Sequence, residues 1–144
     1  MGRRVVPDVV RGQDLLTVAP DASVREAARL MTDRRIGAAL VTERGRLVGI
    51  ITERDVMARV VAEGLDPDTT QVWIVMTADP KTVAPDERSI DALKLMYEDG
   101  FRHLPVVQGS RPVAILSLRD FLAAEFAEMH AELEEEEVIS QTAR

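Results

Sequence analysis

The chain has 144 residues, of which 46% are apolar and 3% aromatic, and its formal net charge at pH 7 is −7. This length fits one ordinary domain, or two small units that share a core. The acidic balance argues against a duplex-binding protein, which needs a basic surface, and the absence of cysteine excludes disulfides, thiolate zinc sites and cysteine nucleophiles.

The N-terminal sequence MGRRVVPDVV lacks the apolar core of a secretion signal, and the apolar runs that follow it are too short to span a bilayer. We therefore expect a cytoplasmic protein without a membrane segment. Nucleic acid is not an expected partner, because the chain is acidic and has one Trp and one Tyr for base stacking.

From residue 17 the pattern predicts a short strand that runs into Thr-Val-Ala-Pro-Asp (17–21), where the proline ends it. Ser23 and Glu26 then have the spacing of a capping box. The apolar residues that follow recur near helical spacing. These signals predict a helix that begins near Ser23.

A β-hairpin is predicted next. Small and β-branched residues at 36–41 form its first strand, the turn at 43–46 contains a glycine suited to positive φ, and 47–51 forms the paired strand. A second helix is expected to begin at Thr52. The unit therefore has the order strand, helix, strand, strand, helix, which is an α/β fold.

The same unit recurs 65 residues later. Segment 17–57 aligns with segment 82–122 without a gap, and 14 of the 41 aligned positions are identical, including all five residues of Thr-Val-Ala-Pro-Asp. The second hairpin is predicted at 104–116, and its closing helix at Ser117. A fixed offset of this kind indicates two copies of one structural unit.

The connection between the copies contains turn-forming residues, and we expect a short helix there that begins at Asp68 or Thr69. After the second copy, residues 119–138 predict one long helix that ends in an acidic run. The expected organisation is a first repeat at 8–66, a second repeat at 67–125, and an acidic C-terminal helix and tail at 126–144.

A hydroxyl residue followed three positions later by aspartate ends each hairpin. These pairs are Thr52 with Asp55, and Ser117 with Asp120. One interpretation is helix capping, in which the hydroxyl accepts backbone N–H groups. The other is ligand binding, because a helix N-terminus attracts anions and a carboxylate there can accept hydrogen bonds from the two hydroxyls of a ribose.

Basic side chains supply candidate phosphate ligands. Arg54 and Arg119 each precede the aspartate by one position, and a guanidinium can hold a phosphate with two parallel hydrogen bonds. Their alternative role is a surface salt bridge. Arg102 and His103 lie just before a strand in the second copy, whereas the first copy has glycine and alanine there. His103 could also be a partly buried, hydrogen-bonded histidine.

Together these motifs resemble a tandem pair of CBS (cystathionine beta-synthase) domains over about residues 8–125. The resemblance rests on the Val-Ala-Pro-Asp entry, the Ala-x-x-Leu-Met helix, the Arg-His-Leu-Pro-Val strand and the Thr/Ser-x-Arg-Asp ending. It implies two β-α-β-β-α repeats that pack sheet against sheet as a pseudo-twofold pair with two clefts. It also implies a homodimer of such pairs.

The resemblance further implies a regulatory, nucleotide-sensing module rather than an enzyme. Its ligand would be AMP, ADP, ATP or S-adenosylmethionine, with no covalent cofactor and no bound metal, and it would act on a regulated protein of unknown identity. The aspartates would hold the ribose, and the backbone around Val18 and Val83 would line the adenine pocket. The nucleotide-binding residues expected on this basis are Thr52, Arg54, Asp55, Ser117, Arg119, Asp120, Arg102, His103, Val18 and Val83.

The two copies differ at positions that matter for the clefts. Ala114 stands where the first motif has Gly49, and its methyl group is expected to crowd a ligand at close range. The pair Arg102 and His103 has no counterpart in the first copy. We therefore expect two clefts of unequal affinity.

An enzyme is a rival interpretation of the same residues. Ser117, His103 and Asp120 have the chemistry of a catalytic triad. However, Ser117 and Asp120 belong to one capping turn, which explains their spacing without a third partner.

A structural or protein-interaction module, which dimerises and contacts a partner without a nucleotide, is the main alternative. Its support is an apolar stripe on the long C-terminal helix, formed by Leu122, Phe126, Met129 and Leu133. Such a stripe suits a dimer seam or a partner groove. It could equally pack on the core of its own chain.

Overall fold

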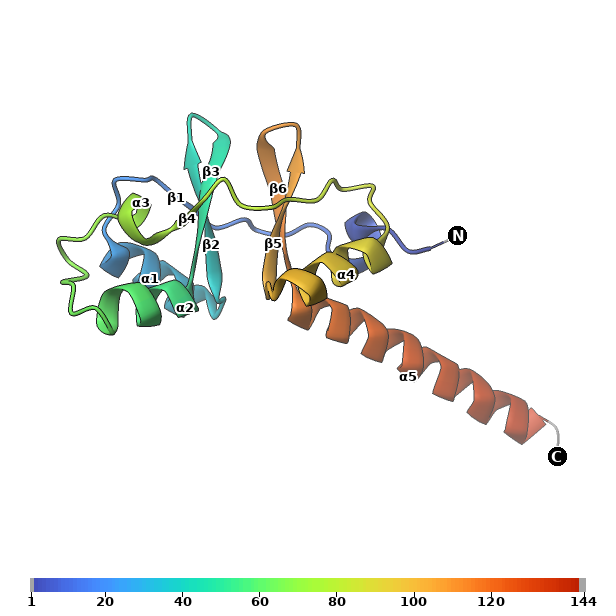
Figure 1. Ribbon diagram of the computed structural model, residues 1–144. Coiled ribbons are helices and arrows are strands. Elements are labelled where there is room, and N and C mark those ends of the chain that lie inside the picture. Colours follow the sequence, from blue (N-terminus) through green and yellow to red (C-terminus); the bar gives the residue numbers. More distant parts are fainter. Residues whose placement is uncertain (1, 143–144) are drawn as a thin grey trace.

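Two similar α/β halves lie side by side in the computed structural model, which describes residues 2–142 (Figure 1). The first half contains β1 (Thr17–Val18), α1 (Val24–Arg34), β2 (Ala38–Glu43), β3 (Arg46–Thr52), α2 (Glu53–Asp55) and the π-helical η2 (Val56–Val61). The second half contains α4 (Ser89–Asp99), β5 (His103–Gln108), β6 (Arg111–Ser117) and α5 (Leu118–Thr142). Short segments lead into the halves: η1 (Val5–Val9), a turn that contains the extended residue Val6, and α3 (Val72–Val75) followed by β4 (Thr77–Ala78). The predicted α/β fold is confirmed.

The two hairpins carry the same irregularity. β2 pairs antiparallel with β3, and β5 with β6, and the register shifts just after Val41 in one and just after Val106 in the other. Val18 pairs in parallel with Val41, and Val83 forms an isolated parallel bridge with Val106. The duplication in the sequence is therefore repeated in the backbone, at the same offset of 65 residues.

The first helix of each half ends in a left-handed residue. α1 begins after Ser23, whose Oγ accepts the N–H of Glu26 at 3.1 Å, as the capping signal predicted. It ends at Arg35, which has φ of 55°. α4 ends at the equivalent position with Gly100, at φ of 74°. Glycine has no steric cost in this region, whereas arginine does.

The short helix between the copies begins later than expected. α3 starts at Val72, not at 68 or 69. Thr70 donates its N–H and its hydroxyl to the carbonyl oxygen of Asp66, at 3.0 and 2.7 Å. These bonds close a separate turn, because Gln71 then forms an extended bridge with Ser23 before the helix can begin.

Each half is completed by a segment that precedes the other half in the chain. η1 packs on α4 and α5, with Val5 in the apolar core of the second half. α3 and β4 complete the first half, with Val72 in its core. The same backbone contact anchors both segments. The N–H of Val5 donates to the carbonyl oxygen of Glu87 at 2.9 Å, and the N–H of Val72 donates to the carbonyl oxygen of Ala22 at 2.8 Å. We call η1 and α3–β4 the exchanged segments.

The hairpins of the two halves pack against each other (Figure 1). The N–H of Leu47 donates to the carbonyl oxygen of Ser110 at 3.0 Å, which joins the two sheets near the hairpin tips. The buried residues of this interface are Ala38, Leu40, Ile50 and Ile115. The pairing of two repeats, sheet against sheet, is confirmed.

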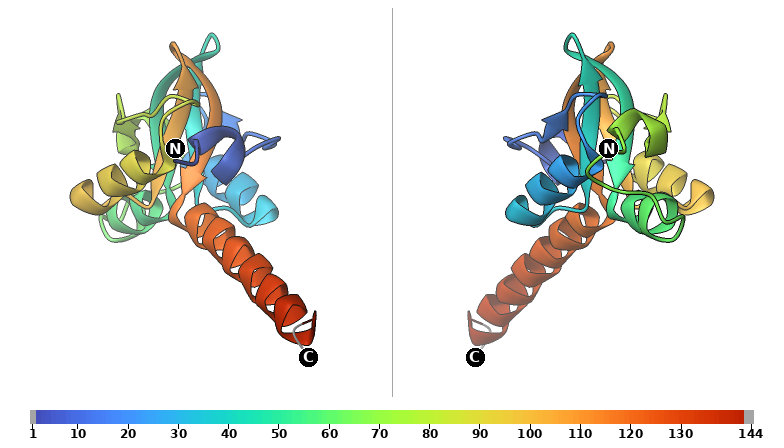
Figure 2. Two further views of the ribbon diagram at one scale, coloured as in Figure 1. Left: turned by 90° about the vertical axis from the view of Figure 1, so that its right-hand side faces the viewer. Right: turned by 90° about the vertical axis from the view of Figure 1, so that its left-hand side faces the viewer.

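α5 leaves the body of the molecule as a long projecting helix (Figures 1 and 2). Arg3 holds its base through ion pairs with Glu125 at 2.8 Å and with Glu128 at 3.4 Å. The stripe of Leu122, Phe126, Met129 and Leu133 is 54–71% exposed. The stripe therefore does not pack on its own core. Residues 143 and 144 of the expected tail lie outside the described residues.

Among residues 2–142, no helix is both long enough and apolar enough to cross a membrane.

Candidate functional site

Two cavities lie between the halves. The Asp120 cavity has a volume of about 760 Å³, and the Asp55 cavity about 800 Å³, both within the usual range of small-molecule sites. Each is walled by the motif of one half and the helix-to-strand loop of the other. Residues 117–120 lie with 35–38 around the first cavity, and 52–55 lie with 100–104 around the second.

The first motif forms the predicted capping box. Asp55 N–H donates to Thr52 Oγ1 at 3.2 Å, and the N–H and hydroxyl of Thr52 donate to Asp55 Oδ2 at 2.9 and 3.0 Å. The second carboxylate oxygen, Oδ1, lies 3.7 Å from Nε of Arg59. Capping therefore uses Oδ2 of Asp55, and the guanidinium of Arg59 forms an ion pair with Oδ1.

The second motif has the same hydrogen bonds and a different neighbour. Asp120 N–H donates to Ser117 Oγ at 3.1 Å, and the N–H and hydroxyl of Ser117 donate to Asp120 Oδ2 at 2.7 and 2.8 Å. The counterpart of Arg59 is Ala124. Within residues 2–142, Oδ1 of Asp120 has no hydrogen-bond or ion-pair partner, so both of its lone pairs remain available.

Gly49, at the start of the first motif, is required by the sheet. It pairs with Ala78 of β4, and a Cβ on Gly49 would lie 2.4 Å from Met76 Sδ and 3.0 Å from the carbonyl oxygen of Thr77. Neither Gly49 nor its counterpart Ala114 lines a cavity. The expected crowding of a ligand by Ala114 is therefore wrong, because its methyl group lies in the core of the second half.

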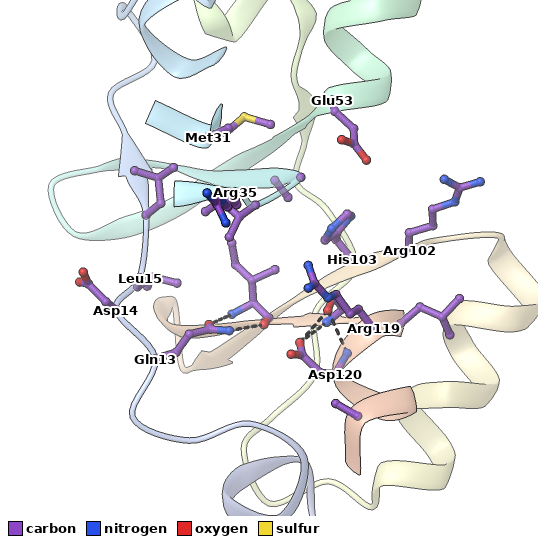
Figure 3. A pocket seen from close by; sticks show the side chains of 18 of the residues that line it. Gln13, Asp14, Leu15, Met31, Arg35, Glu53, Arg102, His103, Arg119 and Asp120 are labelled. Carbon is purple, nitrogen blue, oxygen red and sulfur yellow. Dashed lines mark hydrogen bonds between the residues drawn. The ribbon is translucent and has the colours of Figure 1, made fainter. Parts of the chain in front are cut away.

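Arg102 and His103 line both cavities, because they lie in the wall between them. Figure 3 shows them on the side of the second half, with Glu53 reaching toward them from the first half. A Cβ on Gly37 would lie 3.1 Å from Oε1 of Glu53 and 3.4 Å from Cε1 of His103. The small residues of the first copy thus make room for the large ones of the second, and the pair does not belong to one cavity alone.

Burial lowers the pKa of His103 below its ordinary value of 6.5. The carboxylates of Glu53 and Asp120 oppose this shift, and Arg102 adds to it. A pKa below 6.5 leaves the imidazole of His103 mostly neutral at pH 7. A bound anion would favour its charged form.

The two arginines that precede the aspartates flank different cavities. Arg54 lines the Asp55 cavity, and Arg119 lines the Asp120 cavity, where Figure 3 places it beside His103. Both side chains are exposed, and neither forms an ion pair with any other residue of the range 2–142. The surface salt bridge considered for them is absent, so both guanidinium groups can turn toward a ligand.

Several cavity residues escaped the sequence analysis. The side-chain amide of Gln13 accepts the N–H of Ile115 at 2.7 Å and donates to its carbonyl oxygen at 3.0 Å, as Figure 3 shows. No local sequence pattern predicts this contact, because its two residues lie 102 positions apart in the chain. Arg35 also lines the Asp120 cavity. Its alignment with Gly100 was a usable signal, because an arginine that replaces a glycine at a helix end accepts a backbone cost.

Val18 and Val83 are buried in the cores of the first and second halves, and neither lines a cavity. The chain reaches the cavities a few residues earlier, at 13–16 on one side and at Pro80 and Lys81 on the other. These upstream segments are the backbone that faces each cavity.

The catalytic triad considered for Ser117 is not assembled. Its hydroxyl donates to Asp120 at 2.8 Å, and within the described range no hydrogen bond joins His103 to either residue. Activation of a serine requires a base that accepts its proton, with the third group behind that base. The turn is therefore a helix cap with one carboxylate oxygen to spare.

Comparison with known sequences agrees with the duplication. The CBS domain model matches twice, at residues 6–62 and 71–127. CBS domain-containing protein CBSCBSPB3 of Arabidopsis thaliana is 39% identical over 118 residues, which cover 81% of this chain and 21% of that protein. YhcV of Bacillus subtilis is 35% identical over 104 residues, which cover 72% of this chain and 74% of that protein. The chain thus spans about a fifth of the Arabidopsis relative.

Solved structures with the same fold include a CBS-domain containing protein from Agrobacterium tumefaciens, with a TM-score of 0.76, 32% identity, and coverage of 84% of this chain and 98% of that one. A CBS domain protein from Pyrobaculum aerophilum, complexed with AMP, has a TM-score of 0.74, 29% identity, and coverage of 82% and 89%. A hexameric CBS-CP12 protein from bloom-forming cyanobacteria has a TM-score of 0.76, 28% identity, and coverage of 85% and 67%. The chain belongs to the CBS domain family, with two of its domains in tandem.

Proposed function

We propose that this tandem CBS pair is a regulatory module that binds adenosine-containing nucleotides, of the AMP, ADP, ATP or S-adenosylmethionine class, in its two cavities. The observation that carries the proposal is the duplicated cap: each cavity, of about 760 or 800 Å³, has an aspartate on its wall that keeps one oxygen outside the capping bonds. The fold places these oxygens at equivalent positions in both halves.

The ribose diol is the group that suits this oxygen. A carboxylate has about four acceptor sites, and in Asp120 the cap occupies two of them, both on Oδ2. Oδ1 can accept hydrogen bonds from two vicinal hydroxyls. The hydroxyl of Ser117 or Thr52 retains one lone pair for a further contact. Capping and ribose binding are thus compatible.

The phosphate would meet cations on the remaining walls. Arg119 or Arg54 approaches from the motif of the same cavity, and Arg102 and His103 approach from the shared wall. A guanidinium forms strong, paired hydrogen bonds with phosphate oxygens. The AMP-bound relative from Pyrobaculum aerophilum supports this class of ligand. A cytoplasmic module that senses such nucleotides would act on a regulated protein or on a further segment of a longer chain.

A thermal-shift titration with AMP, ADP, ATP and S-adenosylmethionine tests the proposal. A ligand that binds should stabilise the protein by roughly 2.7 kcal/mol at 100 times its Kd. The Asp55→Ala/Asp120→Ala variant should lose the response. Asp33→Ala, an exposed aspartate on α1, is the matched control and should keep it. If none of the four ligands moves the melting curve of the wild type, the proposal is wrong.

The exposed stripe on α5 favours a second function, that of a dimerising interaction module. The hexameric CBS-CP12 relative shows that proteins of this fold can self-associate. Truncation before Met129, followed by a mass measurement in solution, separates the possibilities. A homodimer that survives truncation is not held by this stripe.

A further inference from the structure

The wall between the cavities contains a single set of charged and titratable residues, and the duplication does not repeat this set. Glu53, Arg102 and His103 line both cavities. At the offset of 65 residues their counterparts are Leu118, Gly37 and Ala38, and all three are uncharged. The duplication therefore built two cavities and one set of wall charges.

The backbone of the wall is nevertheless symmetric. Glu53 N–H donates to the carbonyl oxygen of Gly37 at 2.9 Å, and Leu118 N–H donates to that of Arg102 at 3.0 Å. The side chains alone break the symmetry. A side chain in place of Gly37 would be crowded, because its Cβ would lie 3.1 Å from Oε1 of Glu53 and 3.4 Å from Cε1 of His103.

We propose that this single wall couples the two cavities, so that a phosphorylated nucleotide bound in one weakens the binding of a second in the other. The inference rests on the proposed function, and it adds a rule for how the two sites communicate. Arg102 is the one permanently charged cation of the wall, and its single positive charge is too small to balance two phosphates at once. A second phosphate would meet the first across the wall, with the carboxylate of Glu53 adding to the repulsion.

The environment of the wall strengthens this effect. Burial lowers the pKa of His103, so the ring brings little charge to the wall at neutral pH. One proton taken up by His103 can serve the first phosphate. Salt screens charges inside a partly enclosed site less than it screens charges on an open surface. Coupling between sites commonly changes affinity by about 5- to 150-fold.

Calorimetric titration with AMP and with adenosine separates the phosphate from the rest of the ligand. Asp55→Ala should disable the Asp55 cavity, so that AMP binds only in the Asp120 cavity. Asp120→Ala should disable the Asp120 cavity, so that AMP binds only in the Asp55 cavity. In the wild type, the second AMP should bind at least about 10-fold more weakly than the corresponding cavity binds AMP in its single-cavity variant. Adenosine has no phosphate, so its affinity for the intact cavity of each variant should equal its affinity for the same cavity in the wild type.

A change in the wall itself gives an independent test. Glu53→Gln removes one negative charge from an exposed side chain and keeps the backbone bond to Gly37. It should bring the two AMP dissociation constants of the chain closer together, by a few-fold. Glu43→Gln, which removes the same charge from an exposed glutamate of β2 that lines neither cavity, is the matched control and should leave both constants unchanged.

The outcomes are distinct. Independent AMP constants, equal to those of the single-cavity variants, overturn the coupling and leave the proposed function standing. A protein that binds neither AMP nor adenosine overturns both. If an alanine variant does not fold, the Glu53→Gln variant provides the test. A ratio of its two AMP dissociation constants equal to that of the wild type overturns the coupling.

Discussion

The two halves of the molecule share a turn and differ in what surrounds it. Thr52 and Asp55 form the same three hydrogen bonds as Ser117 and Asp120, to within a few tenths of an ångström. Around the turn, however, the first half places Arg59 beside the carboxylate, whereas in the described part of the second half no ion-pair partner lies beside Asp120. The cap is what the fold requires of both copies, and the side chains around it are where the copies have diverged.

The largest effect on stability is expected from a substitution that makes the first half resemble the second. Gly49→Ala places a methyl group 2.4 Å from Met76 Sδ and 3.0 Å from a backbone oxygen of Thr77. Overpacking of this kind costs about 1–3 kcal/mol, and the backbone contact puts the variant at the upper end. The reverse change, Ala114→Gly, should cost about 1 kcal/mol or less. Chemical denaturation measures both, and equal costs would contradict the steric role of Gly49.

A double substitution removes the difference between the halves at two of the three wall positions. Arg102→Gly with His103→Ala gives the second half the residues of the first. Loss of hydrogen bonds to a charged group costs about 1.5–3 kcal/mol, so AMP should bind about 10- to 100-fold more weakly in both cavities. Adenosine binding should change little. A loss confined to one cavity would show that the wall serves that cavity alone.

The left-handed helix ends offer a smaller test. Arg35→Gly places at φ of 55° the residue type that the second half uses at its own helix end, Gly100. Relief of the left-handed conformation should stabilise the protein by up to about 1 kcal/mol. If Arg35 also contacts a phosphate in the Asp120 cavity, AMP affinity should fall as stability rises. A variant that gains stability and keeps its affinity would assign Arg35 no part in binding.

The smallest effect concerns pH. Burial lowers the pKa of His103 below 6.5 in the folded protein, so below pH 6.5 the unfolded chain takes up this proton more readily than the folded one. The contribution of His103 to stability is therefore full above pH 6.5 and declines as the pH falls toward the folded pKa. His103→Asn should flatten the stability profile in that window. A profile unchanged by the substitution would contradict the shift.

Local patterns predicted the capping boxes and the duplicated hairpins, because both depend on residues close in sequence. Arg59 was within reach of the same reasoning, since it lies four residues after Asp55 on a helix. The wall shared by the two cavities could not be predicted in this way. Aligning the copies assigned Arg102 and His103 to the second repeat, and only the packing of the halves shows that a residue of one repeat faces both cavities. The expectation for Ala114 was wrong for a similar reason, since the close neighbours of its counterpart Gly49 are Met76 and Thr77, which lie far from Gly49 in sequence.

The exchanged segments bear on how such a molecule can arise. A single copy of the unit would lack the piece that completes its core, so two separate copies would have to trade these segments, as in domain swapping. Fusion into one chain makes the trade intramolecular and independent of protein concentration. Once fused, the copies no longer need to be identical. That freedom is what allows one copy to contribute arginine and histidine to the wall while the other contributes the space they occupy.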